Sequence, residues 1–256
     1  MSVDASSAAQ LDAAVDRYAE YVRTEAAQLQ TATHQFADRY TQGDDAGARE
    51  LYPEARTHWE RIEPVAESFG DLDPRLDLRE ADLEAGQAWT GWHRIEKDLW
   101  PPATGYTAAT DAERTQFAEQ LVADTAELVE RVATLTYQPA QLGNGAKELL
   151  DEIATGKVTG EEEIWSGTDL WDFQANIDGA HEAFESLEPV VAAKDGDLVK
   201  QIDDGFGAVQ ELLDSHRSGD GFVTYSELSP AEVKALADAV NALSEPISKL
   251  TSVAVL

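Results

Sequence analysis

The amino-acid sequence predicts an all-α protein whose helices run up and down and pack as one or two bundles. Apolar residues recur at spacings of three and four through most of the chain, which is the period of an amphipathic helix. The alternation of Val and Ile that is typical of strands is missing almost everywhere. Glycine and proline separate the helical stretches, and helices with one apolar face must bury it against one another.

The first two predicted helices span 8–42 and 45–69. Apolar residues keep helical spacing throughout the first, and Gly43 ends it. The second contains Pro53 and Pro64, and each must begin, kink or break it locally because proline has no amide hydrogen to donate.

The next part of the chain alternates loop and helix. Residues 70–82, GDLDPRLDLREAD, are predicted as a loop from their Gly, Asp and Pro content. A helix over 89–100 follows and stops at the Pro pair 101–102. A longer helix is predicted over 111–137, with its apolar residues on one side.

The second half continues this pattern. Helical periodicity returns over 145–156, 169–184, 197–216 and 230–253. No sequence repeat relates the two halves, and 256 residues are enough to bury a substantial core. We therefore expect a single domain over 1–256, with two packed bundle halves, about 1–138 and 139–256, as the alternative.

The composition excludes several classes of partner. The formal charge is −31 at pH 7 and the pI is near 4.2, so the surface repels phosphate backbones and anionic lipid. We expect no binding to nucleic acid. Such an excess also destabilises the compact state unless concentrated salt screens it. We interpret it as a halophile's surface; the alternative is a mesophilic acidic protein that holds many divalent cations.

Cysteine is absent, which excludes disulfides, thiolate zinc sites and thiol catalysis. A bound metal ion would be held by oxygen and imidazole nitrogen. No run approaches the roughly 20 apolar residues that span a bilayer, so we expect no direct membrane insertion by this chain. The N-terminal MSVDASSAAQ lacks a charged start followed by an apolar stretch. Met1 is the only methionine, which suits a start codon placed on a mature fragment whose export signal has been removed.

The stretch 89-WTGWHRIEKDLW-100 places two ionisable side chains among tryptophans. On a helix, Trp89, His93, Glu96 and Trp100 share one stripe. Burying an imidazole and a carboxylate there is costly unless a metal ion, a counter-charge or each other compensates. The spacing of three suits a shared metal ion, although di-iron bundles use the opposite order, Glu-x-x-His. An intrahelical ion pair is the alternative.

Acidic residues gather in further stretches. In 58-HWERIEPVAESF-69, Glu60, Glu63 and Glu67 share a stripe, where like charges repel unless a cation lies between them. A solvated acidic face is the plainer interpretation. Further hard oxygen donors are Asp71, Asp73 and Asp77 in the loop, and Glu161, Glu162 and Glu163 beside Trp165.

Other known patterns are incomplete. Residues 216–227 fit part of a calcium loop, with Asp220, Gly221 and Glu227 in place, but His216 and Ser218 stand where strong ligands belong. We expect a structural turn there. The sequence contains no H-E-x-x-H, no G-x-S-x-G and no phosphate-binding glycine loop.

Several of these stretches together resemble one family, the imelysin-like domain of the EfeO/EfeM-type iron-uptake proteins. The matching stretches occur in the family's order from about Tyr21 to the end: ERIEPVAESFGDLDPRLDLRE, WTGWHRIEKDLW, NGAKELLDEIATGKVTGEEE, TDLWDFQANIDGA and SGDGFVTYSEL. The cupredoxin domain of EfeO is not among them, which makes this chain similar to the shorter EfeM form.

The resemblance implies an imelysin-like helical bundle, located outside the cytoplasmic membrane and often lipid-anchored. It implies binding of ferric or ferrous iron for a membrane permease of the Efe type, with a haem peroxidase-like protein as a further partner. Zinc and copper are rival ions, since imidazole suits them. The implied metal-binding residues are His93 and Glu96, then Glu60, Glu63 and Asp77, joined by Glu161 or Glu162.

The chain departs from the family at Gly167, where WSGTDLWDF replaces the common YSHTDLWDF. The family also carries a peptidase label, but we find no residues that would sustain that activity and expect no enzyme. Two alternatives compete with an iron-binding protein. One is a zinc-dependent metallopeptidase with an open metal position for water. The other is a structural or adhesion bundle whose acidic stripes are surface only.

Overall fold

The computed structural model describes residues 5–255 as helices joined by turns, and the predicted all-α fold is confirmed. Residues 1–4, part of the N-terminal stretch considered for an export signal, and residue 256 lie outside the described part. The α-helices are α1 Ala5–Thr41, α2 Asp45–Glu60, α3 Leu72–Asp77, α4 Trp92–Leu99, α5 Asp111–Val132, α6 Pro139–Thr155, α7 Asp169–Ala192, α8 Gly196–Asp214, α9 Pro230–Ile247 and α10 Leu250–Val255.

Short elements fill the connections. The 3-10 helices are η1 Glu63–Phe69, η2 Glu80–Asp82, η3 Lys157–Thr159 and η4 Tyr225–Glu227. The strands β1 Arg217–Ser218 and β2 Gly221–Phe222 form an antiparallel hairpin with Arg217 opposite Phe222.

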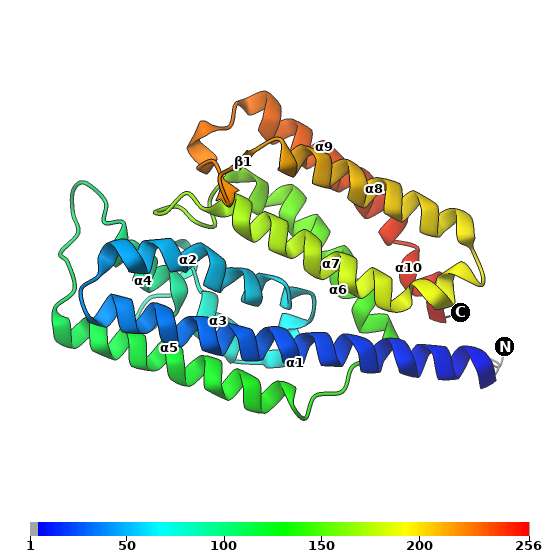
Figure 1. Ribbon diagram of the computed structural model, residues 1–256, viewed down its shortest axis with the longest axis horizontal. Coiled ribbons are helices and arrows are strands. Elements are labelled where there is room, and N and C mark those ends of the chain that lie inside the picture. Colours follow the sequence, from blue (N-terminus) through cyan, green and yellow to red (C-terminus); the bar gives the residue numbers. More distant parts are fainter. Residues whose placement is uncertain (1–4, 256) are drawn as a thin grey trace.

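The helices form layers of roughly parallel and antiparallel rods (Figure 1). Helices α1 and α5 lie along one side of the molecule and α8 and α9 along the opposite side, with α2, α6 and α7 between them. Helix α2 packs on α1 and also on α7, so the first and second halves of the chain meet along α2 and α7. Buried apolar side chains from both halves, such as Leu29, Phe173 and Leu243, belong to one continuous cluster.

Local sequence signals explain where several helices begin. The Thr110 hydroxyl accepts a hydrogen bond from the amide of Glu113, and the Glu113 carboxylate accepts one from the amide of Thr110. This reciprocal cap starts α5. Gly91 precedes α4 with φ +87°, and a Cβ there would collide with the carbonyl oxygen of Leu76. Glycine therefore lets the start of α4 lie directly against α3.

Two predicted boundaries near these helices are wrong. Residues 72–77, predicted as loop, form α3, because Leu72 and Leu76 are fully buried one turn apart and Pro74 lies in the first turn, where it is tolerated. The helix predicted over 89–100 begins only at Trp92, since Gly91 has a left-handed backbone. Trp89 and Trp100 therefore flank α4 instead of sharing its stripe.

Two further helices are shorter than predicted. Helix α5 ends at Val132, where the amide of Ala133 closes the last turn, and Gln138, the residue before Pro139, is extended. The predicted helix over 230–253 is divided into α9 and α10 at Ser248, whose amide hydrogen bonds close the last turn of α9. The predicted apolar side of α5 faces the core, with Leu121, Leu128 and Val132 buried.

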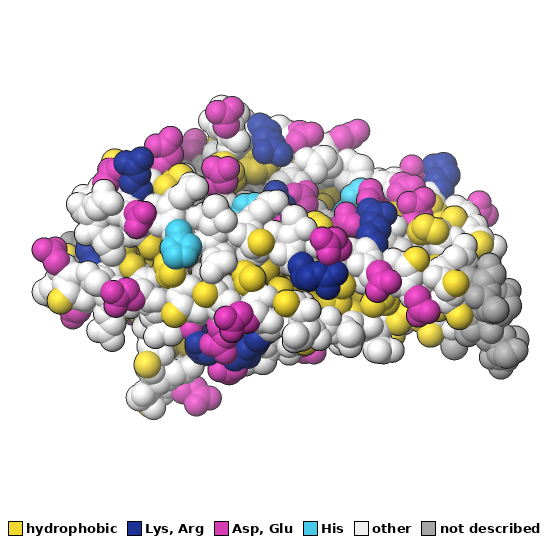
Figure 2. Space-filling model, turned by 60° about the horizontal axis from the view of Figure 1, so that its bottom comes forward, with side chains coloured by type: hydrophobic (Ala, Val, Ile, Leu, Met, Phe, Trp, Pro, Cys, Tyr) yellow, Lys and Arg dark blue, Asp and Glu magenta, His cyan; other side chains and the backbone are white. Residues whose placement is uncertain are grey.

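The surface carries its acidic excess in a dispersed form. On the face drawn in Figure 2, Asp and Glu side chains are spread over the molecule and interrupted by a few Lys and Arg. Among residues 5–255, no helix has the length and apolar content to cross a bilayer. The halophile interpretation stays a prediction.

Candidate metal centre

Six of the seven side chains selected from the sequence come together in the interior. They approach from separate elements: α2 supplies Glu60, η1 Glu63, α3 Asp77, α4 His93 and Glu96, and the segment after η3 Glu162. The seventh, Glu161, lies outside this group. Its side chain is 54% exposed, and its carboxylate lies 3.5 Å from the guanidinium of Arg79.

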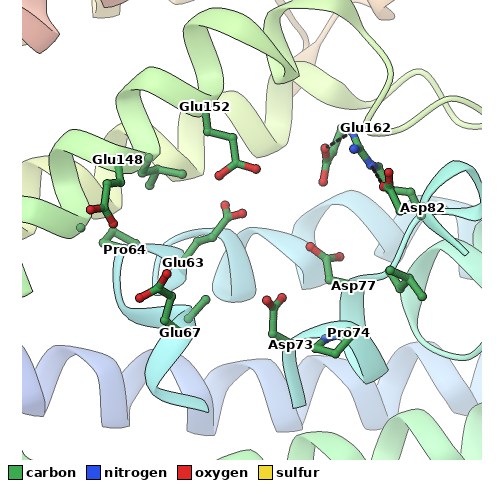
Figure 3. A pocket seen from close by; sticks show the side chains of 15 residues that line it. Glu63, Pro64, Glu67, Asp73, Pro74, Asp77, Asp82, Glu148, Glu152 and Glu162 are labelled. Atoms are coloured by element: carbon green, nitrogen blue, oxygen red, sulfur yellow. Dashed lines mark hydrogen bonds and ion pairs between the residues drawn. The ribbon is translucent and has the colours of Figure 1, made fainter. Parts of the chain in front are cut away.

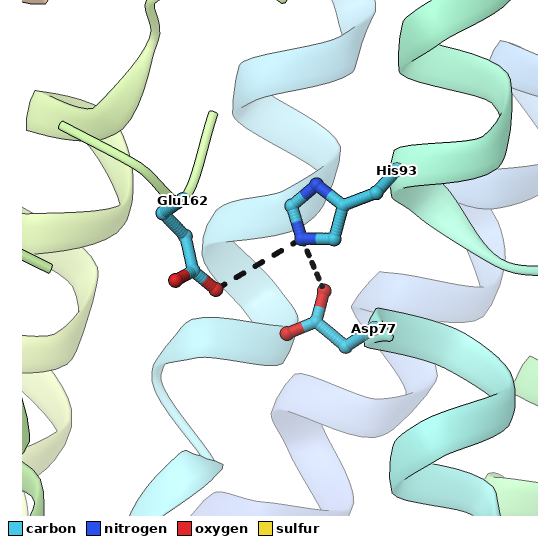
Figure 4. Close-up of side chains that lie close together, drawn as sticks. All are labelled: Asp77, His93 and Glu162. Atoms are coloured by element: carbon cyan, nitrogen blue, oxygen red, sulfur yellow. Dashed lines mark ion pairs between the residues drawn. The ribbon is translucent and has the colours of Figure 1, made fainter. Parts of the chain in front are cut away.

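His93 is the centre of the arrangement and is only 2% exposed. Its Nε2 atom lies 3.4 Å from Oδ1 of Asp77 and 3.9 Å from Oε1 of Glu162. Figure 4 shows these two carboxylates pointing toward the ring from α3 and from the segment after η3. No hydrogen bond with acceptable geometry reaches Nε2, although the atom is buried. The ring therefore directs Nε2 at two acidic oxygens without a well-aligned hydrogen bond to either.

Glu96 holds the other edge of this imidazole. Its Oε2 lies 3.2 Å from Nδ1 of His93, and its Oε1 accepts hydrogen bonds from the amides of Trp165 at 2.9 Å and Ser166 at 2.7 Å. Burial raises the pKa of Glu96, but hydrogen bonding to His93 and to the Ser166 amide outweighs it, so the pKa is lowered. Glu96 is therefore a fixed carboxylate that orients the ring.

Without a bound metal ion, the histidine is cationic. Burial and the nearby Arg56 lower the pKa of His93, but the adjacent carboxylates of Asp77 and Glu96 outweigh them and raise it to about 10. A metal ion at Nε2 would have to replace this proton.

Arg56 is a central residue that the sequence analysis missed. Its guanidinium is fully buried, with Nε 2.6 Å from Oε1 of Glu163 and Nη2 3.2 Å from Oδ2 of Asp172. It also contacts the carboxylates of Glu60 and Asp77. The one available signal was its position four residues before Glu60, a common ion-pair spacing on a helix.

Lys157 is a second buried cation that the sequence analysis missed. It is 4% exposed, and its Nζ lies 2.9 Å from Oε2 of Glu60, 2.7 Å from Oε2 of Glu63 and 3.8 Å from Oε1 of Glu162. Burial lowers the pKa of Lys157, but these carboxylates raise it well above its usual value. The chain's own ammonium group therefore lies among the glutamates of α2 and η1.

Glu163 was grouped with its acidic neighbours but was not chosen as a ligand. It is fully buried, and its carboxylate accepts hydrogen bonds from Tyr52 Oη at 3.2 Å and Ser166 Oγ at 2.9 Å. With the Arg56 contact, this carboxylate is enclosed by protein groups. Only the tertiary structure separates it from the exposed Glu161.

An acidic cleft of about 380 Å³ gives access to the cluster from solvent. Figure 3 shows carboxylates from η1, α3 and α6 pointing into it, including Glu63, Asp73 and Glu152, together with Asp77 and Glu162. Burial, with the nearby Asp77 and Glu152, raises the pKa of Asp73 to about 6. The cleft thus concentrates negative potential and attracts cations toward His93.

Two groups of side chains within residues 5–255 have ligand atoms close enough together to hold one ion. Asp77, His93 and Glu162 form the first, and His93, Glu96 and Glu163 form the second, with all ligand atoms of a group within 4.8 Å. Ligands at about 2.1 Å from an ion lie about 3.0–3.5 Å apart, so small side-chain shifts suffice. The first group borders the cleft through Asp77 and Glu162. Arg56, Tyr52 and backbone amides enclose the second.

Two other sequence features have structural explanations. Gly167 adopts φ +71°, and its carbonyl accepts a hydrogen bond from the amide of Tyr225 at 2.9 Å. A histidine would strain this left-handed turn.

In the segment considered as a calcium loop, the Glu227 carboxylate accepts hydrogen bonds from the amide and hydroxyl of Thr224, both at 3.0 Å. It caps η4, in keeping with the expected structural turn.

Comparisons with known proteins place the chain among bacterial relatives. The family model described as imelysin matches residues 14–250. An Efem/EfeO family lipoprotein of Staphylococcus haemolyticus is 41% identical over 248 residues, which are 96% of this chain and 85% of that protein. The iron uptake system component EfeO of Yersinia pestis is 41% identical over 242 residues, 93% of this chain and 63% of its own length. EfeO of Escherichia coli is 40% identical over 246 residues, which are 95% of this chain and 64% of that protein. The chain therefore spans less than two thirds of these two EfeO proteins.

Proposed function

Because this chain belongs to the imelysin family, we propose that it binds iron as part of an iron-uptake system. The resemblance to the imelysin-like domain of EfeO/EfeM-type proteins is confirmed by the family model and by relatives about 40% identical over most of the chain. The names of the EfeO relatives, iron uptake system components, support iron as the cargo.

The observation that carries the proposal is the position of Nε2 of His93, which has no well-aligned hydrogen bond. This buried atom faces the carboxylates of Asp77 and Glu162, and both of these residues line the acidic cleft. Nε2 has no well-aligned hydrogen bond to either carboxylate, and a metal ion that replaces its proton would bind the ring together with both carboxylates. We assign Nε2, Asp77 and Glu162 as the primary ligands.

Glu96 has a different part in this proposal. Its contact with Nδ1 leaves Nε2 free to bind an ion, and the two amide hydrogen bonds to Oε1 keep the carboxylate in place. Outer carboxylates of this kind orient metal-binding histidines and raise their basicity. Carboxylate oxygens suit hard ions such as ferric iron, and the imidazole keeps zinc and copper as rivals.

The names of the relatives also support a proposal for the location of the protein and for its partners. A relative named as a lipoprotein supports a location outside the cytoplasmic membrane. There the chain would hold iron for a membrane permease of the Efe type, with a haem peroxidase-like protein as a further partner. The acidic cleft is open to solvent, so bound iron can leave by the path it entered. We propose binding and presentation of the ion, not catalysis.

The test is a metal titration of the purified chain. Ferric citrate, ferrous iron under anaerobic conditions and zinc are added in turn, and stoichiometry and Kd are measured. We expect His93→Ala to abolish high-affinity binding, and His34→Ala, at an exposed position on α1, to leave it unchanged. Equal binding by wild type and His93→Ala would remove the proposed site. Chelator-sensitive cleavage of peptides by the zinc-loaded protein would favour a metallopeptidase.

A further inference from the structure

We propose that Arg79 competes with the bound ion for the carboxylate of Glu162 and thereby sets the rate at which the ion is released. The inference rests on the proposed function, in which Glu162 is a primary ligand. It makes Arg79 a positioning residue, because its guanidinium acts on the ion through Glu162 and does not bind the ion itself.

Arg79 and His93 approach different oxygens of one carboxylate. Nη1 of Arg79 lies 3.4 Å from Oε2 of Glu162, and Nε2 of His93 lies 3.9 Å from Oε1. A metal ion on His93 that takes Oε1 would therefore share this carboxylate with a guanidinium. Groups that contact the outer side of a metal ligand change how strongly the ligand binds. A neighbouring cation weakens it, because the cation and the metal ion repel each other.

Arg79 can leave Glu162 and keep other ion pairs. Its Nε lies 2.7 Å from Oδ2 of Asp82, and its Nη1 lies 3.5 Å from Oε1 of Glu161. The side chains of these two acidic residues are 46% and 54% exposed, and exposed pairs of this kind form and break at little cost. A small movement of the guanidinium thus exchanges a proposed metal ligand for two carboxylates outside the ligand set.

The surroundings leave room for this movement. Arg79 lines the acidic cleft and also a neighbouring cavity of about 400 Å³, whose walls include Glu161, Ile164 and Trp165. Its side chain is 29% exposed, whereas that of Arg56 is fully buried and paired on several sides. Arg56 is therefore held in place by packing, and Arg79 is free to respond to an ion.

Charge gives the direction of the exchange. In the empty site, Glu162 lies among other acidic groups, and pairing with Arg79 offsets the burial of its charge. A divalent or trivalent ion on Oε1 repels the guanidinium and favours its outer pairs with Asp82 and Glu161. As the ion leaves, Arg79 returns to Oε2, so the carboxylate is not left without a counter-charge. The ion is then bound less tightly, and released faster, than it would be without Arg79.

The test removes the charge of Arg79. Kd is measured for wild type, Arg79→Met, Arg79→Lys and Arg131→Met by competition between zinc and a chelator of known affinity. The release rate is measured by stopped-flow transfer of zinc to that chelator, and both measurements are repeated with ferric iron. We expect Arg79→Met to bind about 10-fold more tightly, the lower end of what outer groups contribute, and to release the ion correspondingly more slowly.

Two variants are controls for this effect. Arg79→Lys keeps the positive charge and should stay close to wild type in Kd and release rate. Arg131→Met removes one positive charge from a side chain of similar exposure, 31%, whose partners Asp71 and Glu127 are outside the proposed ligand set. It should also match wild type.

A second background shows whether Arg79 acts through Glu162. The amide of Glu162→Gln carries no charge for the guanidinium to pair with, so adding Arg79→Met there should change the Kd no more than Arg131→Met does. An equal gain in both backgrounds would overturn the inference in favour of a general charge effect. If Glu162→Gln binds zinc too weakly to measure, the direction of the change in Arg79→Met decides alone.

The direction of the change separates this part from a structural one. If Arg79 only holds Glu162 in place, Arg79→Met binds the ion more weakly. Weaker or unchanged binding, or tighter binding in Arg79→Lys as well, would overturn the inference and leave the proposed function intact. No metal binding by wild type would instead remove the proposed function. Circular dichroism of the metal-free variants checks folding, and Arg79→Gln, with the same expectation, replaces Arg79→Met if that variant does not fold.

Discussion

Nε of Arg56 lies 2.6 Å from Oε1 of Glu163, and both side chains are fully buried. Arg56 belongs to α2 in the first half of the chain, and Glu163 to the segment between η3 and α7 in the second. This ion pair thus connects the two halves of the chain beside the proposed site, where Arg56 contacts Asp77 and Glu163 lies near His93. The same Oε1 of Glu163 lies 3.8 Å from Nδ1 of His93.

Removing the charge of Arg56 should strongly destabilise the protein. Arg56→Met leaves the carboxylates of Glu163 and Asp172 buried without their counter-charge, and breaking a buried pair costs about 3–5 kcal/mol. Urea unfolding followed by circular dichroism measures the loss. Arg23→Met, at a partly exposed pair on α1, is the control and should change the free energy of unfolding by less than about 1 kcal/mol. Similar losses of unfolding free energy in both variants would show that the ion pairs of Arg56 stabilise the fold no more than an exposed pair does.

Glu96→Gln separates orientation from direct binding. If Glu96 orients His93, the variant should keep one metal ion but bind it about 10–100-fold more weakly. The Kd from the same zinc and iron titrations is compared with that of Glu20→Gln, an exposed position on α1. Complete loss of binding, as in His93→Ala, would make Glu96 a primary ligand. An unchanged Kd would show that the contact with Nδ1 has no effect on the site.

Metal binding should stabilise the folded chain. A ligand that binds only the native state adds about 2.7 kcal/mol at a free concentration of 100 times its Kd. We expect a rise in Tm with ferric citrate or zinc, reversal by a chelator and no rise in His93→Ala. If neither ion changes the Tm of wild type at any salt concentration, a structural or adhesion bundle becomes the better explanation.

Salt should stabilise the protein if the acidic surface is that of a halophile. The net charge of −31 repels itself, and at 1 M salt the Debye length falls to about 3 Å, which screens this repulsion. The Tm of the metal-free protein is measured in KCl from 0.1 to 3 M. Sucrose of equal osmolality is the control for preferential exclusion. If KCl raises the Tm no more than sucrose does, the acidic surface does not contribute to salt adaptation.

Much of the helical fold follows from local sequence. The apolar spacing of α1, α7 and α8 is regular over many turns, and it predicts both their existence and their buried sides. The predicted helix boundaries were less accurate where contacts between residues far apart in the chain determine them. The composition of residues 72–77 predicts a loop, but this segment is helical in the structure, where Leu72 and Leu76 are buried. Helix α4 begins after Gly91 and not at Trp89, because the backbone of α3 lies directly against Gly91.

By itself, the sequence determined that His93 and Glu96 lie on one side of a helix among tryptophans, and that no cysteine thiolate is available to a metal site. Only the tertiary structure decided which acidic groups meet the ring and which cations neutralise them. Arg56 and Lys157 come from segments far apart in the chain, and nothing local to either residue predicts that its charge is buried. Pairing between buried charges depends on distance in space, and that distance is set by the packing of helices.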